Sequence, residues 1–333
     1  MNKIDLNKKV TIKYILIFLL LIIHLIFIFK KSSNSYKGKV CICTLAKKEN
    51  NYIREWTEHY KNYGVDKIYL YDNNDINGEN FESVIGDYIK EGFVEIFNWR
   101  GKIKFHYKFM NDCYNRNNKN YDWLIFYELD EFIHLSNFTN VKPFLNGKKF
   151  EKCEIIYLNL IVHNDNNQLF YQNISLFKRF PNIVVSDNLQ VKMIIKGGIN
   201  DIRIKTTAQC SLTNNESKIL KCDGFGRPTN INGFFTKITD YRYNYVDHFF
   251  CKSSEEFTNK LARGDSLQTG KALEIYKLNR IKRYFEYNNF TYEKLKMFEK
   301  SLVLKDIVVE YDRFIKEIHN KYGIKLKYLN ITL

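Results

Sequence analysis

Three acidic residues follow an almost wholly apolar segment in the first half of the chain. Glu128, Asp130 and Glu131 come directly after Trp123–Tyr127, whose composition predicts a strand that is buried on both faces. In an extended chain, side chains two positions apart point the same way, so we expect Glu128 and Asp130 to converge on one point. Carboxylate oxygens suit Mg²⁺ or Mn²⁺, usually together with substrate phosphates. The segment predicts a divalent-metal site, and the alternative is a solvated acidic strand end.

Two further motifs offer residues that could complete such a site. His248 stands between Asp247 and two phenylalanines. A histidine among aromatic residues is typical of a packed core, but its imidazole is also a suitable third ligand for Mn²⁺. Lys252 follows four residues later and could meet a phosphate. Asp165 lies in an asparagine-rich stretch that forms either an ordinary turn or a site that presents this carboxylate to a sugar hydroxyl, or as a general base.

The elements that must position these residues alternate between strand and helix up to the acidic segment. Strands are predicted at 39–46, 66–72, 93–97 and 123–127, and helices at 52–63, 81–90 and 107–116. This alternation predicts parallel β-α-β units in a doubly wound, mostly parallel α/β sheet. Ligands of such sheets bind beyond the carboxyl ends of the strands, where the acids lie. Farther along, we predict strands at 153–160 and 192–196 and helices at 255–263, 271–287 and 292–322.

The composition excludes some classes of protein. The net charge is +15 from 52 basic and 37 acidic residues, and it reflects either a phosphate-bearing partner or a general compositional bias. Because the basic residues are scattered, no nucleic acid partner is expected. The 7 cysteines include no pair at the spacing of a zinc site. No disulfide framework is implied, although one bridge, between Cys210 and Cys222, remains open.

The N-terminal segment predicts a membrane anchor. Residues 14–29 are apolar and uncharged, Lys13 precedes them, and Lys30 and Lys31 follow. The run is short for a bilayer, which needs about 20 residues, but flanking lysines can extend the span. A cleaved signal peptide is the alternative, and the argument against it is that Lys30 and Lys31 follow the run rather than a small-residue cleavage site. We expect a tail at 1–13, a single-pass anchor of type II orientation at 14–29 and a stem at 30–38. The membrane would be that of the ER or Golgi in a eukaryote, or the inner membrane in a bacterium.

Several ordered motifs resemble those of a known family. They are Cys43–Trp56, Gly64–Asn73, Asp122–Phe132, Asn164–Asn166, Leu176–Phe180, Lys192–Lys196, and Asp247–His248 with Lys252–Gly264. Together they resemble the family 92 glycosyltransferases and their family 2-like relatives, which have the GT-A fold, over residues 40–299. The resemblance implies a GT-A domain at 39–333, with a nucleotide-sugar-binding half at 39–135, an acceptor and metal-completing half at 136–270, and C-terminal helices at 271–333.

The resemblance also implies a reaction and a set of site residues. It implies that a sugar, often galactose, passes with inversion from a nucleotide sugar, expected to be UDP-linked, to a glycan with the help of Mn²⁺ or Mg²⁺. The metal ligands would be Asp130, Glu128 and His248, and the general base Asp165 or Glu131, with Asp165 preferred. The residues expected to bind the donor are Thr44, Ala46, Lys47, Glu49, Asp72, Glu128 and Lys252.

Two departures from the family pattern bear on these assignments. Glu128 stands where the family usually has Asp, so Asp130 is expected to be the main metal ligand. The family often carries Arg and then His in a later stretch that here contains Lys196 and Gln209 but no His. These departures motivate an alternative in which the chain is a catalytically inactive, membrane-tethered protein that binds glycans or acts as a scaffold.

Overall fold

The computed structural model describes residues 38–102, 106–184, 188–213, 219–231, 235–237, 243–264 and 268–322. The chain divides into two compact units between Lys37 and Gly38, and every described residue belongs to the second. The predicted tail, the anchor at 14–29 and nearly all of the stem therefore lie outside the described residues. Within the described ranges, no helix has both the length and the apolar character that a membrane span requires.

The first half of the folded unit alternates strand and helix, as predicted. Its elements are β1 (Val40–Ala46), α2 (Asn50–Asn62), β2 (Lys67–Asp72), α3 (Glu82–Lys90), β3 (Val94–Asn98), α4 (His106–Asn117) and β4 (Trp123–Ile125). The strands pair in parallel in the order β3-β2-β1-β4. Each predicted element in this half is present, because the apolar patterns of these segments match the strand and helix periods.

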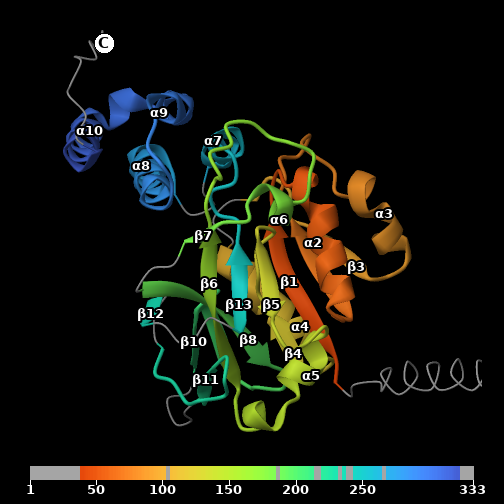
Figure 1. Ribbon diagram of the computed structural model, residues 1–333. Coiled ribbons are helices and arrows are strands. Elements are labelled where there is room, and N and C mark those ends of the chain that lie inside the picture. The colour runs from red at the N-terminus through yellow and green to blue at the C-terminus, as the bar shows by residue number, and fades with distance from the viewer. Residues whose placement is uncertain are drawn as a thin grey trace, which may run out of the picture. The chain divides into compact units, whose positions relative to one another are not determined.

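The sheet is mostly parallel along its main path, as predicted, and its antiparallel pairs all lie in the second half. β8 (Asn188–Lys196) runs antiparallel to both of its neighbours on the main path, β4 and β6 (Ile155–His163). β13 (Asn244–His248) is parallel to β6, and β5 (Glu131–Leu135) is antiparallel to β13. β4 and β5 follow each other in the chain but do not pair, because β8, β6 and β13 lie between them in the sheet order. The sheet order is β3-β2-β1-β4-β8-β6-β13-β5, and Figure 1 shows it from one side.

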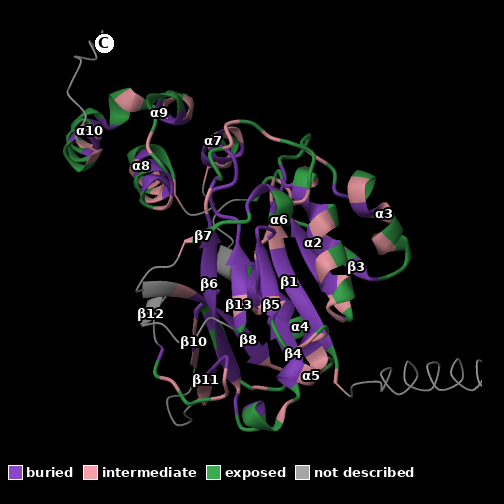
Figure 2. Cartoon of the chain, in the orientation of Figure 1, coloured by how far each residue is buried: buried purple, intermediate pink, exposed green. Residues whose placement is uncertain are grey.

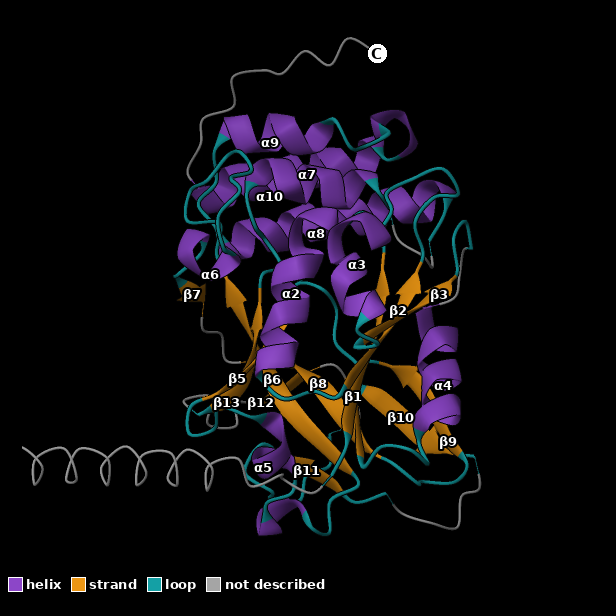
Figure 3. Cartoon of the chain, turned by 90° about the vertical axis from the view of Figure 1, so that its right-hand side faces the viewer, coloured by secondary structure: helices purple, strands orange, loops and turns teal. Residues whose placement is uncertain are grey.

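Short strands and further helices surround this sheet. β7 (Ile183–Val184) and β11 (Lys221–Asp223) pair with β6, β12 (Phe235–Lys237) pairs with β8, and β9 (Ile202–Thr206) forms a hairpin with β10 (Gln209–Leu212). The later helices are α5 (Val141–Leu145), α6 (Leu176–Arg179), α7 (Ser254–Ala262), α8 (Gly270–Tyr287), α9 (Tyr292–Glu299) and α10 (Val308–Tyr322), and short 3-10 helices lie at Lys148–Phe150 and Leu304–Asp306. Helices α7 to α10 gather beyond the carboxyl ends of the parallel strands (Figure 3).

The single helix predicted at 292–322 is two helices. Both the amide and the hydroxyl of Ser301 donate to the carbonyl oxygen of Phe298, at 2.9 and 2.6 Å, which closes the end of α9. A 3-10 turn at Leu304–Asp306 then leads into α10. A serine that bonds to a nearby carbonyl competes with the helical pattern, which explains the break.

Three apolar clusters form the core, and buried residues run along the sheet in Figure 2. One packs α2 and α3 against one face of the sheet, a second packs α4 and the β9–β10 hairpin against the other, and a third joins α7 to the C-terminal helices. Helices on both faces of the sheet agree with the predicted doubly wound arrangement.

The structure contains two disulfides and corrects the predicted bridge. Cys43 in β1 is bonded to Cys113 in α4, and Cys153 is bonded to Cys222. Cys222 reaches Cys153 because β11 pairs in parallel with β6 and places Cys222 opposite Ile156. Cys210 is a buried free cysteine in the hairpin. Cysteine spacing alone does not determine connectivity.

Candidate active site

The acidic segment is a turn, and this changes which acids come together. β4 ends at Ile125, and the chain turns at Leu129 and Asp130 before β5 begins at Glu131. The expected extended path, which would have brought Glu128 beside Asp130, is therefore wrong. Asp130, Glu131 and His248 instead each offer a ligand atom, and these atoms lie within 4.8 Å of one another. Strand register explains the cluster, because β13 pairs with β5 so that His248 lies opposite Glu131.

Helix α2 and the turn itself hold Glu131 in place. The indole Nε1 of Trp56 and the hydroxyl of Tyr60 both donate to the Glu131 carbonyl oxygen, at 3.0 and 2.8 Å. The Glu131 carboxylate accepts a hydrogen bond from the backbone N–H of Glu128 at 3.0 Å. The carbonyl oxygen of Asp130 accepts from the N–H of Phe249 at 2.9 Å, which ties the turn to the end of β13. The backbone of the acid cluster is thus fixed from three sides.

Two lysines form ion pairs with the three acids. Lys192 lies with its Nζ 2.7 Å from Glu128 Oε1 and 2.8 Å from Glu131 Oε1. Burial lowers the pKa of Lys192, but the attraction of these carboxylates outweighs burial and raises it overall. Lys260 forms a short ion pair with Asp130 Oδ2. Burial raises the pKa of Asp130, but the neighbouring basic groups, Lys260 first among them, together outweigh burial and hold this pKa well below its usual range.

His248 completes a donor set that fits a hard or borderline divalent ion. Its Nε2 lies 3.8 Å from Asp130 Oδ2 and 3.9 Å from Glu131 Oε1. Burial lowers the pKa of His248 to about 3, so the ring is neutral at pH 7 and can offer a lone pair. Its buried Nδ1 has no hydrogen-bond partner among the described residues. No hydrogen bond at Nδ1 therefore turns Nε2 away from the two carboxylates. Two carboxylates and a neutral imidazole suit Mn²⁺ or Mg²⁺.

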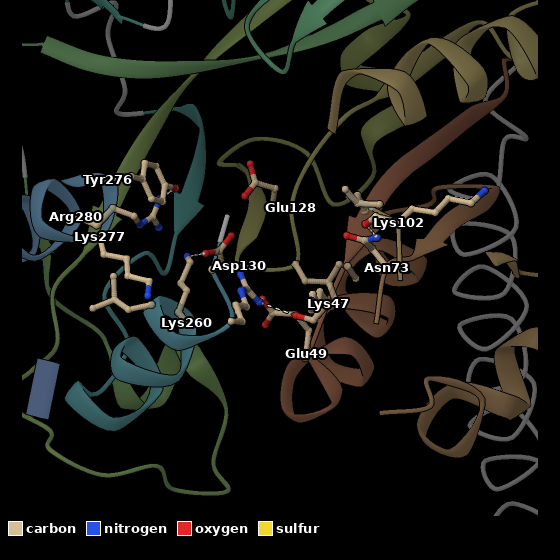
Figure 4. Close-up of a pocket in the computed structure, with 16 residues that line it drawn as sticks. Lys47, Glu49, Asn73, Lys102, Glu128, Asp130, Lys260, Tyr276, Lys277 and Arg280 are labelled. Carbon is tan, nitrogen blue, oxygen red and sulfur yellow. Dashed lines mark hydrogen bonds and ion pairs between the residues drawn. The ribbon is translucent and has the colours of Figure 1, made fainter. Parts of the chain in front are cut away.

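A cavity of about 180 Å³ lies against this cluster. It is bounded by the end of β1, by the turn at Glu128–Asp130, and by α7 and α8. Figure 4 shows Lys260 reaching Asp130 while the carboxylate of Glu128 lies apart from it. The basic residues that line the cavity outnumber the acidic ones. The acidic residues are Glu49, Glu128 and Asp130, and the basic residues are Lys47, Lys102, Lys260, Arg263, Lys277 and Arg280. A concave site with this excess of cations suits an anionic ligand.

Four of the residues predicted to bind the donor line this cavity: Ala46, Lys47, Glu49 and Glu128. Glu49 forms a short ion pair with Arg263, whose guanidinium also donates to the Lys47 carbonyl oxygen at 2.7 Å. The β1–α2 connection is thereby tied to the end of α7. This contact closes one side of the cavity.

The other three predicted donor residues lie around the cavity rather than in its lining. Thr44 is fully buried, and its hydroxyl has no hydrogen-bond partner among the described residues. Asp72 accepts from Arg100 Nε at 2.7 Å and from the backbone N–H of Asn74 at 2.9 Å, so it holds the loop after β2. Lys252 lies 3.4 Å from Glu49 and over the ring of Tyr52, at the wall of a second cavity of about 420 Å³.

Asp165, the preferred general base, is a buried structural residue and lies elsewhere. Its carboxylate Oδ2 is 2.5 Å from the ammonium of Lys294 and accepts from the hydroxyl of Tyr284 at 2.6 Å. Its backbone N–H donates to Asn288 Oδ1 at 2.6 Å. These partners belong to α8, α9 and the segment between them, so Asp165 fastens the loop after β6 to the C-terminal helices. The structure does not bring it to the cavity.

Six cations at the site were not predicted from the sequence: Lys102, Lys192, Lys260, Arg263, Lys277 and Arg280. Lys192 had a usable signal, because a lysine within an apolar strand is seldom fully buried without an acidic partner. Arg280 packs over the ring of Phe250, with its Cζ 4.5 Å from the ring centroid. Lys260 and Arg263 lie within the Lys252–Gly264 motif, but no role was assigned to either, and Arg280 lies on α8, where no local pattern marks it.

Fold and site together define a class: an α/β protein with a cation-lined cavity beyond the carboxyl ends of parallel strands, beside a carboxylate–histidine cluster. Residues 37–214 match glycosyltransferase family 92. This match covers more than half of the 333 residues, and the chain belongs to that family. The matched region includes Asp130, Glu131 and Lys192, whereas His248 and the cations of α7 and α8 lie beyond it.

Curated relatives of the family come from plants. A family 92 protein of Ricinus communis is 24% identical over 129 residues, which are 38% of this chain and 22% of the relative. One from Arabidopsis thaliana is 25% identical over 107 residues, which are 32% of this chain and 18% of the relative. The chain thus matches less than a quarter of the length of these relatives.

Among solved structures, TarS 1–349 of S. aureus is 12% identical, with 86% of this chain and 76% of that chain covered. The TM-score is 0.33, and a likeness at this level carries no argument about the ligand or the reaction.

Proposed function

We propose that this protein is a divalent-metal-dependent glycosyltransferase that moves a sugar from a nucleotide sugar, expected to be UDP-linked, to a glycan. The observation that supports it most is the cation-rich cavity directly beside Asp130, Glu131 and His248 in a member of family 92. A nucleoside diphosphate is the anionic leaving group of such a donor, and a site of this kind stabilises it as negative charge develops. Galactose as the sugar and inversion at the anomeric carbon are parts of the proposal that rest on the family resemblance.

In this proposal, separate groups of the described residues bind the metal, the phosphates and the nucleoside. Asp130, Glu131 and His248 would hold the metal ion, which supplies a positive charge that stabilises the departing diphosphate. Arg263 and Arg280 line the cavity and would bind the phosphates, and the end of β1 would accept the nucleoside. Glu131, the other predicted base, is 1% exposed and bonded to Lys192. It is therefore better placed to hold the metal than to reach an acceptor hydroxyl.

A donor screen tests this function. The purified folded domain is incubated with a panel of UDP-sugars, and UDP release is measured with Mn²⁺ and with EDTA. We expect turnover of at least one donor in Mn²⁺ and none in EDTA. Asp130→Asn should lower turnover by about 100-fold or more, since the loss even of outer-shell partners of a metal ligand costs 10–100-fold. Asp87→Asn, on the exposed surface, is the matched control. Full activity of Asp130→Asn would refute the assignment of the metal site.

A second candidate is a membrane-tethered glycan-binding or scaffolding protein without activity. One observation favours it: the carboxylate oxygens of Asp130 and Glu131 that face His248 each already have a lysine partner. An acid cluster neutralised in this way can be purely structural. No UDP release from any donor, together with binding to immobilised glycans, would support this candidate over the first.

We also propose that residues 14–29 anchor the protein in a membrane, with the folded unit on the oxidising side. The apolar run and its flanking lysines motivate the anchor, and the two disulfides of the folded unit fit an oxidising compartment. In a eukaryote this is the lumen of the ER or Golgi, and in a bacterium the outer side of the inner membrane. Release of the protein from membranes by an alkaline carbonate wash would contradict the anchor.

A further inference from the structure

The side chain of Lys260 occupies the oxygen of Asp130 that a metal ion would need. Its Nζ is paired with Asp130 Oδ2, the same oxygen that lies 3.8 Å from His248 Nε2. A divalent cation held between Asp130 and His248 would lie directly beside this ammonium group. Two positive charges at that separation repel each other strongly in a buried site. Lys260 and the metal therefore compete for Asp130.

Lys192, the other lysine of the cluster, is held more firmly than Lys260. Lys192 stands on the central strand β8 and binds two acids, Glu128 and Glu131. For Lys260, Asp130 is the only acid within ion-pair distance among the described residues. Lys260 also stands on α7 at the edge of the cavity, where a change of side-chain rotamer moves its ammonium group without moving the backbone. Of the two lysines, Lys260 is therefore the one whose ammonium group can move away from its acidic partner, Asp130.

The cavity offers Lys260 a second position. Lys260 lines the 180 Å³ space together with Arg263 and Arg280, the cations proposed above to bind the phosphates. With Asp130 taken by a metal, the ammonium group would remain among like charges until an anion enters. The phosphates of a nucleotide would supply that anion.

We propose that Lys260 is a positioning residue that holds Asp130 in the ligand-free protein, yields it to the divalent metal, and then binds the phosphates of the nucleotide. The proposal rests on the metal site proposed above. It predicts that one side chain weakens metal binding and strengthens nucleotide binding. Because the metal displaces Lys260 into the cavity, metal and nucleotide bind with positive coupling, and that coupling is reciprocal.

Two binding measurements on the folded domain test it. Mn²⁺ affinity without nucleotide is measured by electron paramagnetic resonance of free Mn²⁺, and UDP affinity at saturating Mn²⁺ by calorimetry. Lys260→Met should tighten Mn²⁺ by on the order of tenfold and weaken UDP by a similar factor. Lys260→Gln, a more polar replacement, should shift both in the same directions, and Lys260→Arg should stay close to the wild type. Lys102→Met, which removes a charge from the same cavity without touching Asp130, should leave Mn²⁺ affinity nearly unchanged.

Opposite shifts of the two affinities distinguish this role from a structural one, which would weaken both. Unchanged or weaker Mn²⁺ binding in both Lys260→Met and Lys260→Gln would overturn the proposal. If neither the wild type nor the variants bind Mn²⁺, the proposal fails together with the metal site. Turnover of a UDP-sugar in EDTA would then show that the transferase function stands without the metal.

Discussion

At the scale of single residues, the acid cluster depends on which carboxylate faces the imidazole. Sequence spacing suggested Glu128 with Asp130, but the turn directs Glu128 toward Lys192 and places Glu131 beside His248. The Glu128 side chain is 41% exposed and that of Glu131 is 1% exposed. The two glutamates therefore have different environments although they stand three positions apart.

This difference predicts opposite consequences for the same substitution. Glu131→Gln replaces a carboxylate ligand with an amide and should weaken Mn²⁺ binding by about 10–100-fold. Glu128→Gln should leave Mn²⁺ affinity within a few-fold of the wild type, because its carboxylate lies outside the cluster. Mn²⁺ titration of the two variants, with thermal unfolding as a check on folding, measures both. An equal loss in Glu128→Gln would restore the ligand set predicted from the sequence.

At the scale of elements, helix α2 positions the acid cluster, a role that its apolar pattern does not predict. Ile53, Trp56 and Tyr60 form the buried stripe that predicted the helix. The structure shows that Trp56 and Tyr60 also donate hydrogen bonds to Glu131. Tyr52, one turn earlier, donates to Glu256 of α7 at 2.5 Å. Helix α2 therefore holds both the acid cluster and α7, the helix that carries Lys260. A change in the packing of α2 is expected to alter the site as well.

The loop after β6 is joined to α8 and α9 by the buried pair of Asp165 and Lys294. Asp165→Asn should destabilise the fold by about 3–5 kcal/mol, because Lys294 is then buried without its counter-charge. The double variant Asp165→Asn with Lys294→Met should recover part of this loss. Urea unfolding measures the stability, and UDP release measures the activity of the folded fraction. A large fall in turnover at unchanged stability would instead make Asp165 the general base.

At the scale of the whole molecule, two disulfides connect segments that are distant in sequence. Their partners are 70 and 69 positions apart, and one bridge links β1 to α4 on the face opposite α2. Closing loops of this length constrains the unfolded chain. Helices α7 to α10 have an apolar core of their own, which reaches β6 through Val162 and the end of β13 through Phe250.

Reduction of these bridges should lower the free energy of unfolding by about 2–5 kcal/mol for each bridge. Alkylation of the denatured, unreduced protein should label Cys41, Cys210 and Cys251 and spare the other four cysteines. Peptide mass spectrometry identifies the labelled positions. The variant Cys210→Ser should keep both bridges, whereas labelling of Cys153 in the wild type would contradict the pairing.

The sequence by itself determined the strands and helices of the first half and the place of the acids after β4. These depend on short-range patterns: apolar periodicity within a segment, and acids that directly follow a buried strand. The tertiary structure alone decided which of those acids meet. Lys260 lies 130 positions from Asp130, and His248 reaches Glu131 only through the register of β13 on β5. The same holds for Asp165 in the loop after β6, whose partner Lys294 belongs to α9. Long-range packing determines which charges pair in a buried site, and the local sequence does not predict these pairs.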